Sequence, residues 1–203
     1  MAKGQASSRR SDILRAAEKL MATKGLNGVT TRQISRKVGC SEGALYVHFK
    51  GRLDLLLAML EECLPDARQS LDKLQGSPGR SSPQENLVMA LTGLYRFHQR
   101  VVPLFAGLFA EPKLLAAYRK SLIAHNKGPH LAIAALERYI DEEQKMQRID
   151  KHIDASLAAY TLLSSCFLRA FVEHFFAKSM QPPWNKFVED LVAQTTHAAR
   201  HRG

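Results

Sequence analysis

The side chains best suited to chemistry are concentrated between Thr30 and Arg52. Hydroxyl, imidazole and cationic groups of this kind donate hydrogen bonds to phosphate oxygens. By polar reach, the candidates for phosphate contact are Thr30, Thr31, Tyr46, His48, Lys50 and Arg52. Backbone amides at helix N-termini would assist at Thr30, at Thr31 and at the Gly51-Arg52 step. The stretch therefore favours binding of a phosphate backbone.

Two short helices are needed to position these groups, and local signals predict both. Thr30 and Gln33 fit a capping box, Gly39 suits a left-handed helix end, and Ser41 suits the cap of a second helix. Apolar staple pairs flank the two caps, Val29 with Ile34 and Cys40 with Leu45. Helix, short turn with glycine, helix is the helix-turn-helix pattern, which places its second helix in the DNA major groove.

Apolar stripes on both sides predict further helices around this pair. Upstream, the stripe predicts an amphipathic helix that ends near Gly25; downstream, it predicts a helix from Arg52 that Pro65 stops. The residues of the two stripes are Ile13, Leu14, Ala17, Leu20 and Met21, then Leu53, Leu56, Leu57, Leu60 and Leu64. We therefore expect a three-helix core with a fourth helix leading out.

The segment RRSDILRAAEKLMATKGLNGVTTRQISRKVGCSEGALYVHFKGRLDLL resembles the DNA-binding domain of the tetracycline-repressor (TetR) family. The matching pieces are ILRAAEKL, GLNGVTTRQIS, GCSEGALY and HFKGRLDLL, in that order. The whole segment covers about a quarter of the chain. The sequence departs from the family pattern at Met21, Cys40, Val47 and Arg52.

The resemblance supports the phosphate-facing set and adds residues of the second helix, beginning at Ser41. Glu42, Gly43, Ala44 and Val47 are placed where base edges would be met. Glu42 would accept from a cytosine amino group, and the apolar side chains would touch a thymine methyl. Two alternatives stay open: Tyr46 packs in the core, or Glu42 only favours the helix dipole. Further phosphate contacts from the first helix or the arm before it are expected of Arg9, Arg10 and Arg15, with a mobile tail as the alternative for Arg9.

Charge gives independent support. Residues 1–53 hold 11 Lys/Arg and 3 Asp/Glu, a net charge of +8, whereas residues 54–203 hold 18 and 16, a net charge of +2. A basic patch that coincides with a helix-turn-helix is typical of a duplex binder. The alternatives are a basic surface that only confers solubility, or an anionic membrane as the partner.

Composition limits the remaining classes. With 203 residues, 45% of them hydrophobic, the chain can bury a sizeable core in one or two domains. The start, MAKGQASSRRSD, lacks the apolar region of a signal peptide, and no apolar run reaches about 18 residues. We therefore expect a cytoplasmic protein without a membrane partner. The three cysteines, 40, 63 and 166, lack metal or disulfide spacing. No cofactor or metal site is expected, since fraying of the tail is favoured over metal binding by His197 and His201.

The pattern beyond Leu64 is helical throughout. We expect an all-α fold of about nine helices, with a DNA-binding domain over residues 1–53 and a helical effector-binding and dimerisation domain over residues 54–203. Residues 76–83, GSPGRSSP, predict an exposed loop, residues 103–110 a separate short helix or turn, and Gly128-Pro129 a break.

The last two helices are expected at about residues 153–177 and 184–199. Ile153, Leu157, Tyr160, Phe167, Phe171 and Phe175 lie along the first of them, and Trp184, Phe187, Val188, Leu191 and Val192 form a regular stripe along the second. The first is apolar over more than one face, and such a helix is buried on several sides. The TetR resemblance implies a homodimer through these two helices; the alternative is that they only close the monomer's own core.

A TetR-like fold also implies a small-molecule pocket among the middle helices. Its expected lining is His98, Phe105, Phe109, Tyr118, His125, Tyr160 and Phe167, with ordinary core packing as the alternative for each. No catalytic motif such as G-x-S-x-G or H-E-x-x-H is present, so we expect no enzyme. We expect a dimeric repressor that reads a pseudo-palindromic operator in double-stranded DNA and is released by an effector. The alternative is a ligand-independent or activating regulator.

Overall fold

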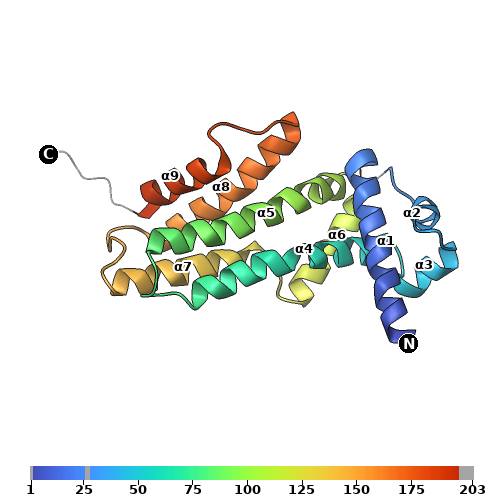
Figure 1. The fold of residues 1–203 in the computed structure, drawn as a ribbon, viewed down its shortest axis with the longest axis horizontal. Helices are drawn as coiled ribbons and strands as arrows, with labels where there is room; N and C mark the ends of the chain where they lie inside the picture. Colours follow the sequence, from blue (N-terminus) through green and yellow to red (C-terminus); the bar gives the residue numbers. More distant parts are fainter. Residues whose placement is uncertain (1, 26–27, 197–203) are drawn as a thin grey trace. The chain divides into compact units, whose positions relative to one another are not determined.

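A computed structural model describes residues 2–25 and 28–196 of the chain (Figure 1). In these ranges every regular element is an α-helix, as expected. The helices are α1 (Ala2–Lys24), α2 (Thr31–Val38), α3 (Glu42–His48), α4 (Arg52–Gln75), α5 (Pro83–Phe109), α6 (Pro112–Ala124), α7 (Pro129–Lys145), α8 (Ala155–Phe176) and α9 (Trp184–Thr196).

The helices form two compact units. The N-terminal unit runs through Cys63 and also contains Pro103–His125, whereas the C-terminal unit contains Leu64–Val102 and begins again at Asn126. The division into functional domains at residue 53 stays a prediction.

The N-terminal unit is organised around side chains from its first four helices. Ile13 of α1, Ile34 of α2, Leu45 of α3 and Leu56 of α4 are all buried. Helix α1 ends one residue before Gly25, which has φ +70°, so the predicted end near this glycine is confirmed. This core fixes α2 and α3 against α1 and leaves their polar sides in solvent.

The C-terminal unit buries apolar faces of α5, α7, α8 and α9. Its fully buried members include Leu91 of α5, Tyr139 of α7, Leu162 of α8 and Val192 of α9. Trp184, the first residue of α9, stacks on Tyr95 of α5 with ring centroids 3.8 Å apart and donates to Thr92 Oγ1 at 3.1 Å. The aromatic stack therefore fastens the start of α9 to α5.

Two proline predictions were wrong. Pro65 does not stop the helix that begins at Arg52, and Pro103 does not begin a separate short element, because α4 and α5 continue through them. Burial of Ala67 and Leu74 beyond the first proline, and of Leu104 and Leu108 beyond the second, favours continued helix.

The cost of Pro103 is also offset by a side chain. Proline has no N–H to donate to the carbonyl four residues earlier, which is that of Gln99. His174 Nε2 lies 2.6 Å from this oxygen and supplies a replacement hydrogen bond from α8. A contact between residues 75 apart is invisible to a local helix-breaking rule.

The break at Gly128-Pro129 is confirmed, and so is the predicted loop over 76–82, whereas Pro83 is buried as the first residue of α5. Helix α6 ends at Ala124, α7 begins at Pro129, and the chain between α4 and α5 has no regular structure. The loop is held locally, because Gly79 N donates to Glu143 Oε1 at 3.1 Å.

Helix α8 differs from the sequence expectation in one respect. Its 22 residues, with a mean hydropathy of 1.4, make it long and apolar enough to cross a membrane by length and composition. Ala159, Leu162 and Cys166 nevertheless pack in the core of the C-terminal unit, next to α7 and α9. This burial is the behaviour of a core helix in a folded domain.

Candidate nucleic-acid interface

The predicted caps of α2 are present. Gln33 N donates to Thr30 Oγ1 at 3.2 Å, and Thr30 N donates to Gln33 Oε1 at 3.2 Å, which completes the capping box. At the other end Gly39 has φ +72°, and Cys40 N donates to Ser35 O at 2.9 Å. The left-handed glycine turns the chain sharply after α2, so that α3 begins only three residues later.

Ser41 is the N-cap of α3, as predicted, and its hydroxyl accepts from Ala44 N at 3.1 Å. Leu45 is fully buried, and it anchors α3 in the unit's core. On the opposite side Tyr46 is 50% exposed and Val47 is 82% exposed. A valine held in solvent on a rigid helix contributes nothing to the core, so Val47 is available to contact a partner.

Polar contacts join the outer sides of α2 and α3. Thr31 Oγ1 donates to Glu42 Oε2 at 3.4 Å and lies 3.4 Å from the Tyr46 hydroxyl, while Arg32 Nε is 3.9 Å from Glu42 Oε1. Tyr46 is therefore directed along the surface, not into the core, and Glu42 already has partners on α2. Both side chains therefore contact α2 in the free protein.

The start of α4 adds two cations. Lys50 is exposed, and its backbone N–H donates to Asp54 Oδ2 at 3.0 Å. Arg52 is paired with Glu111, which directly precedes α6, with Nη2 2.6 Å from Oε1. No local sequence pattern indicates this acidic partner, since it lies 59 residues further along the chain.

The remaining expected contact residues also lie in the N-terminal unit. His48 is half-buried at the end of α3, Gly43 is exposed, and Ala44 is half-buried. On α1, Arg10 lies over the Phe49 ring at 5.3 Å and Arg15 pairs with Asp12 at 2.5 Å, while Arg9 is exposed. One unit thus carries the whole proposed nucleic-acid set and most of the chain's excess positive charge.

The seven residues expected to line an effector pocket are divided between the units. Phe105 and Tyr118 face each other across α5 and α6 in the N-terminal unit, with centroids 6.3 Å apart, while Phe109 and His125 are exposed there. Burial raises the Tyr118 pKa. In the C-terminal unit His98 is buried edge-on against Phe167, and Tyr160 is 60% exposed.

His98 is the least solvated histidine of this group. It is 8% exposed, and Phe97 and Phe167 pack against its ring with centroids 5.3 and 5.7 Å away. Burial lowers its pKa to about 4, because the cationic form would lose its hydration. The imidazole is consequently neutral at physiological pH.

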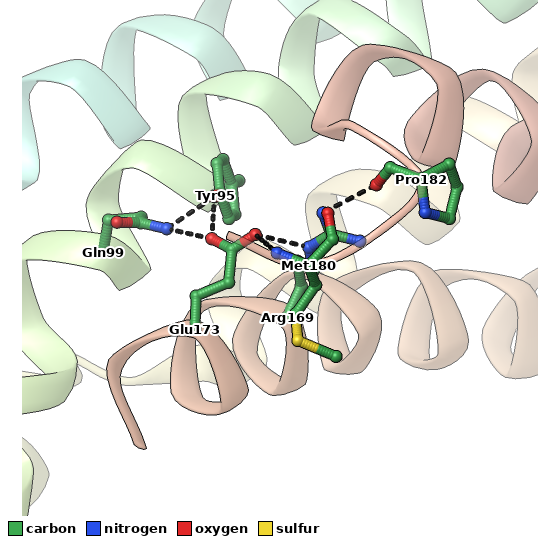
Figure 2. Close-up of polar contacts among 6 residues, drawn as sticks. All are labelled: Tyr95, Gln99, Arg169, Glu173, Met180 and Pro182. Carbon is green, nitrogen blue, oxygen red and sulfur yellow. Dashed lines mark hydrogen bonds and ion pairs between the residues drawn. The ribbon is translucent and has the colours of Figure 1, made fainter. Parts of the chain in front are cut away.

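A polar cluster in the C-terminal unit escaped the sequence analysis (Figure 2). Arg169 and Glu173 of α8 form its centre, and Tyr95 and Gln99 of α5 both donate to Glu173 Oε2. Arg169 also donates to the backbone oxygens of Met180 and Pro182 in the connection to α9. A cavity of about 600 Å³ opens beside the cluster, and it contains none of the seven residues expected to bind an effector.

Among the described side chains, no group of three or more His, Cys, Asp or Glu is placed to hold a metal ion. All three cysteines are free. His197 and His201 lie outside the described residues.

One part of the chain is similar to a known protein family. The family model described as bacterial regulatory proteins, tetR family, matches residues 13–59. The transcriptional repressor KstR2 of Mycobacterium tuberculosis is 33% identical over 84 residues, which cover 36% of this chain and 42% of KstR2. The chain thus matches less than half the length of this relative.

Solved structures share the fold over nearly the whole chain. The fatty acid degradation regulator FadR of Bacillus halodurans matches with a TM-score of 0.69 at 14% identity, covering 96% of this chain and 97% of FadR. The regulator FadR of Bacillus subtilis, in complex with stearoyl-CoA, matches with a TM-score of 0.66 at 14% identity, covering 92% and 97%. The all-helical fold with an N-terminal helix-turn-helix is therefore the fold of these regulators.

Proposed function

We propose that this chain, which carries a tetR-family domain at residues 13–59, is a sequence-specific transcriptional repressor that acts in the cytoplasm. The observation that carries the proposal is the outward face of α3. Leu45 fixes the helix in the core while Val47 remains 82% exposed on a segment with a net charge of +8. Helix α3 enters the DNA major groove, and the repressor KstR2 is among the relatives of the chain.

In this proposal two groups of side chains share the contacts. The phosphate contacts fix orientation and come from Thr30, Thr31, Tyr46, His48, Lys50 and Arg52. The base-edge contacts come from the segment that begins at the Ser41 cap, namely Glu42, Gly43, Ala44 and Val47.

The proposed molecule is a homodimer, and the exposed side of α8 supports this. Leu157, Tyr160, Phe167, Phe171 and Phe175 all lie on it at 41–71% exposure. Phe171 stacks between Phe167 and Phe175, with centroids 6.3 and 5.9 Å away. A continuous apolar surface of this kind marks an interaction site. Helices α8 and α9 of two copies form the interface, and the two α3 helices read a pseudo-palindrome.

Release by a small molecule completes the proposal. A ligand that prefers the conformation with displaced α3 helices would shift the population away from the DNA-bound form. The stearoyl-CoA complex of the B. subtilis FadR is one case of a small molecule bound to this fold. The proposed lining remains the seven residues named above.

The test is DNase footprinting on the region upstream of the chain's own gene, at low ionic strength, with and without candidate effectors. A short pseudo-palindromic protected site that an effector relieves is expected. Broad protection would identify an architectural DNA protein, and no protection on any promoter fragment would overturn the proposed function. Protection that no compound relieves would remove the effector.

The dimer is tested separately by sedimentation with Phe171→Glu, which should give monomers. Ile123→Glu is the matched control, since Ile123 is an apolar residue on α6 that is even more exposed than Phe171, at 81% against 42%, and lies outside the proposed interface.

A further inference from the structure

Arg52 and Glu111 join two helix starts within the N-terminal unit. Arg52 is the first residue of α4, and Glu111 directly precedes Pro112, the first residue of α6. Both carboxylate oxygens face the guanidinium: Nη1 donates to Oε2 at 3.2 Å, and Nη2 lies 2.6 Å from Oε1. The Arg52 side chain is 40% exposed and that of Glu111 is 27% exposed, so the pair lies at the surface.

A carboxylate in this position uses the same part of arginine that a phosphate would use. Arginine binds both anions through the parallel N–H groups of its planar fork. Arg52 belongs to the phosphate-facing set of the proposed function. In the free protein its fork therefore already faces an anion that belongs to the chain itself.

The Glu111 side chain does not cap its own helix. Glu111 occupies the N-cap position of α6, but its side chain makes no cap hydrogen bond, and only its backbone oxygen accepts, from Leu115 N at 2.9 Å. The carboxylate instead extends to α4. When Arg52 leaves, the carboxylate remains beside a helix N-terminus, where the dipole stabilises negative charge.

We propose that Glu111 is an intramolecular competitor of the DNA phosphate for Arg52. DNA binding exchanges the carboxylate of Glu111 for a backbone phosphate on the Arg52 guanidinium. The competitor lowers affinity for every sequence alike, because it acts on a phosphate contact and not on a base contact. This inference rests on the proposed DNA-binding function and adds a residue of α6 to its regulation.

The test is Glu111→Gln, an isosteric change that removes the competing charge. Affinity for the protected operator and for unrelated duplex should rise by about threefold to fivefold, the scale of one exposed ion pair. The slope of log K against log salt should change by less than the about 0.9 expected of one additional phosphate contact on duplex DNA, because Arg52 contacts a phosphate in both proteins. Circular dichroism and thermal melting verify that the variant is folded.

A double-mutant cycle with Arg52→Gln separates this mechanism from a general gain of positive charge. In the Arg52→Gln background, Glu111→Gln should change neither the affinity nor the salt slope, because the guanidinium for which Glu111 and phosphate compete is absent. An equal gain in both backgrounds would overturn the inference, as would unchanged binding by Glu111→Gln alone. Wild-type protein that binds no DNA would instead overturn the proposed function, and this inference with it.

Discussion

Arg169 and Glu173 form a nearly buried ion pair one turn apart on α8, with Arg169 Nε donating to Glu173 Oε1 at 2.7 Å. The side chains are only 7% and 12% exposed, so each charge depends mainly on its protein partners. The pair holds the start of the α8–α9 connection through Met180, whose N–H donates to Glu173 Oε1 at 3.3 Å (Figure 2).

Replacing Glu173 should therefore be costly. Glu173→Gln leaves the Arg169 charge buried without its partner, and we expect a loss of about 3 kcal/mol in the free energy of unfolding. Urea denaturation followed by circular dichroism measures it. The matched control is Asp190→Asn, because the exposed Lys186–Asp190 pair has the same i,i+4 spacing at 2.6 Å. That change should cost less than about 1 kcal/mol.

Buried His98 predicts a loss of stability in mild acid. Burial lowers the pKa of His98 from 6.5 to about 4 in the folded state. Above pH 6.5 the His98 imidazole is neutral in both the folded and the unfolded state, and its full contribution to stability is present. As the pH falls toward 4, the imidazole gains a proton only in the unfolded state, and the contribution is lost. The loss should be on the order of 3 kcal/mol.

Urea denaturation measures the free energy of unfolding of the wild type and of His98→Phe at pH 7.5 and at pH 4.5. The difference between the two proteins isolates the effect of His98, because the titration of the carboxylates is common to both. A difference that does not change with pH would show that His98 is not the group responsible.

Protonation of Glu173 also lowers the stability of the folded state, but at a lower pH than that of His98. Burial alone would raise its pKa, but hydrogen bonds from Tyr95 and Arg169 outweigh burial and hold the pKa below 4.5. Its contribution is present above 4.5 and is lost as the pH falls further. In the Glu173→Gln protein the acid decline of stability below pH 4.5 should be shallower than in the wild type.

Close packing between α4 and α5 depends on Gly93. A Cβ at Gly93 would lie 1.8 Å from Ser70 Oγ and 2.6 Å from Ser70 Cβ. We expect Gly93→Ala to lower the free energy of unfolding by about 1–3 kcal/mol through overpacking. Adding Ser70→Gly removes both clashing atoms, so the double variant should be more stable than Gly93→Ala alone. Thermal melting of the four proteins tests this, and additive losses would contradict the packing explanation.

Phosphate and base contacts should separate in DNA-binding measurements. Lys50→Ala should weaken binding to all sequences and reduce the salt slope by about one unit, since one phosphate contact is lost. Glu42→Ala should leave the salt slope largely unchanged and alter preference among operator variants by about 1–3 kcal/mol. Titration at several salt concentrations measures both quantities. Lys37→Ala, at an exposed cation on α2 outside the proposed set, is the control.

Local chemistry explains what the sequence predicted well. The caps at Thr30 and Ser41 and the left-handed turn at Gly39 depend only on residues within a few positions, and all three are confirmed. The alignment of Leu157, Tyr160, Phe167, Phe171 and Phe175 along α8 follows from helical spacing for the same reason, whereas their exposure does not.

The failures involve partners far apart in the chain. The Gln99 carbonyl that Pro103 leaves open is satisfied by His174, and the polar partner of Arg52 is Glu111. No periodicity or cap signal encodes such pairings, because they arise only when separate helices pack. The membership of the C-terminal polar cluster was unpredictable on the same ground.

The stack of Trp184 on Tyr95 has a practical consequence, because Trp184 is the chain's single tryptophan. The fluorescence of its indole reports on one location, the contact between α9 and α5, without any attached dye. Detachment of α9 would hydrate the ring and shift its emission to longer wavelength, so the protein carries its own optical reporter of that event.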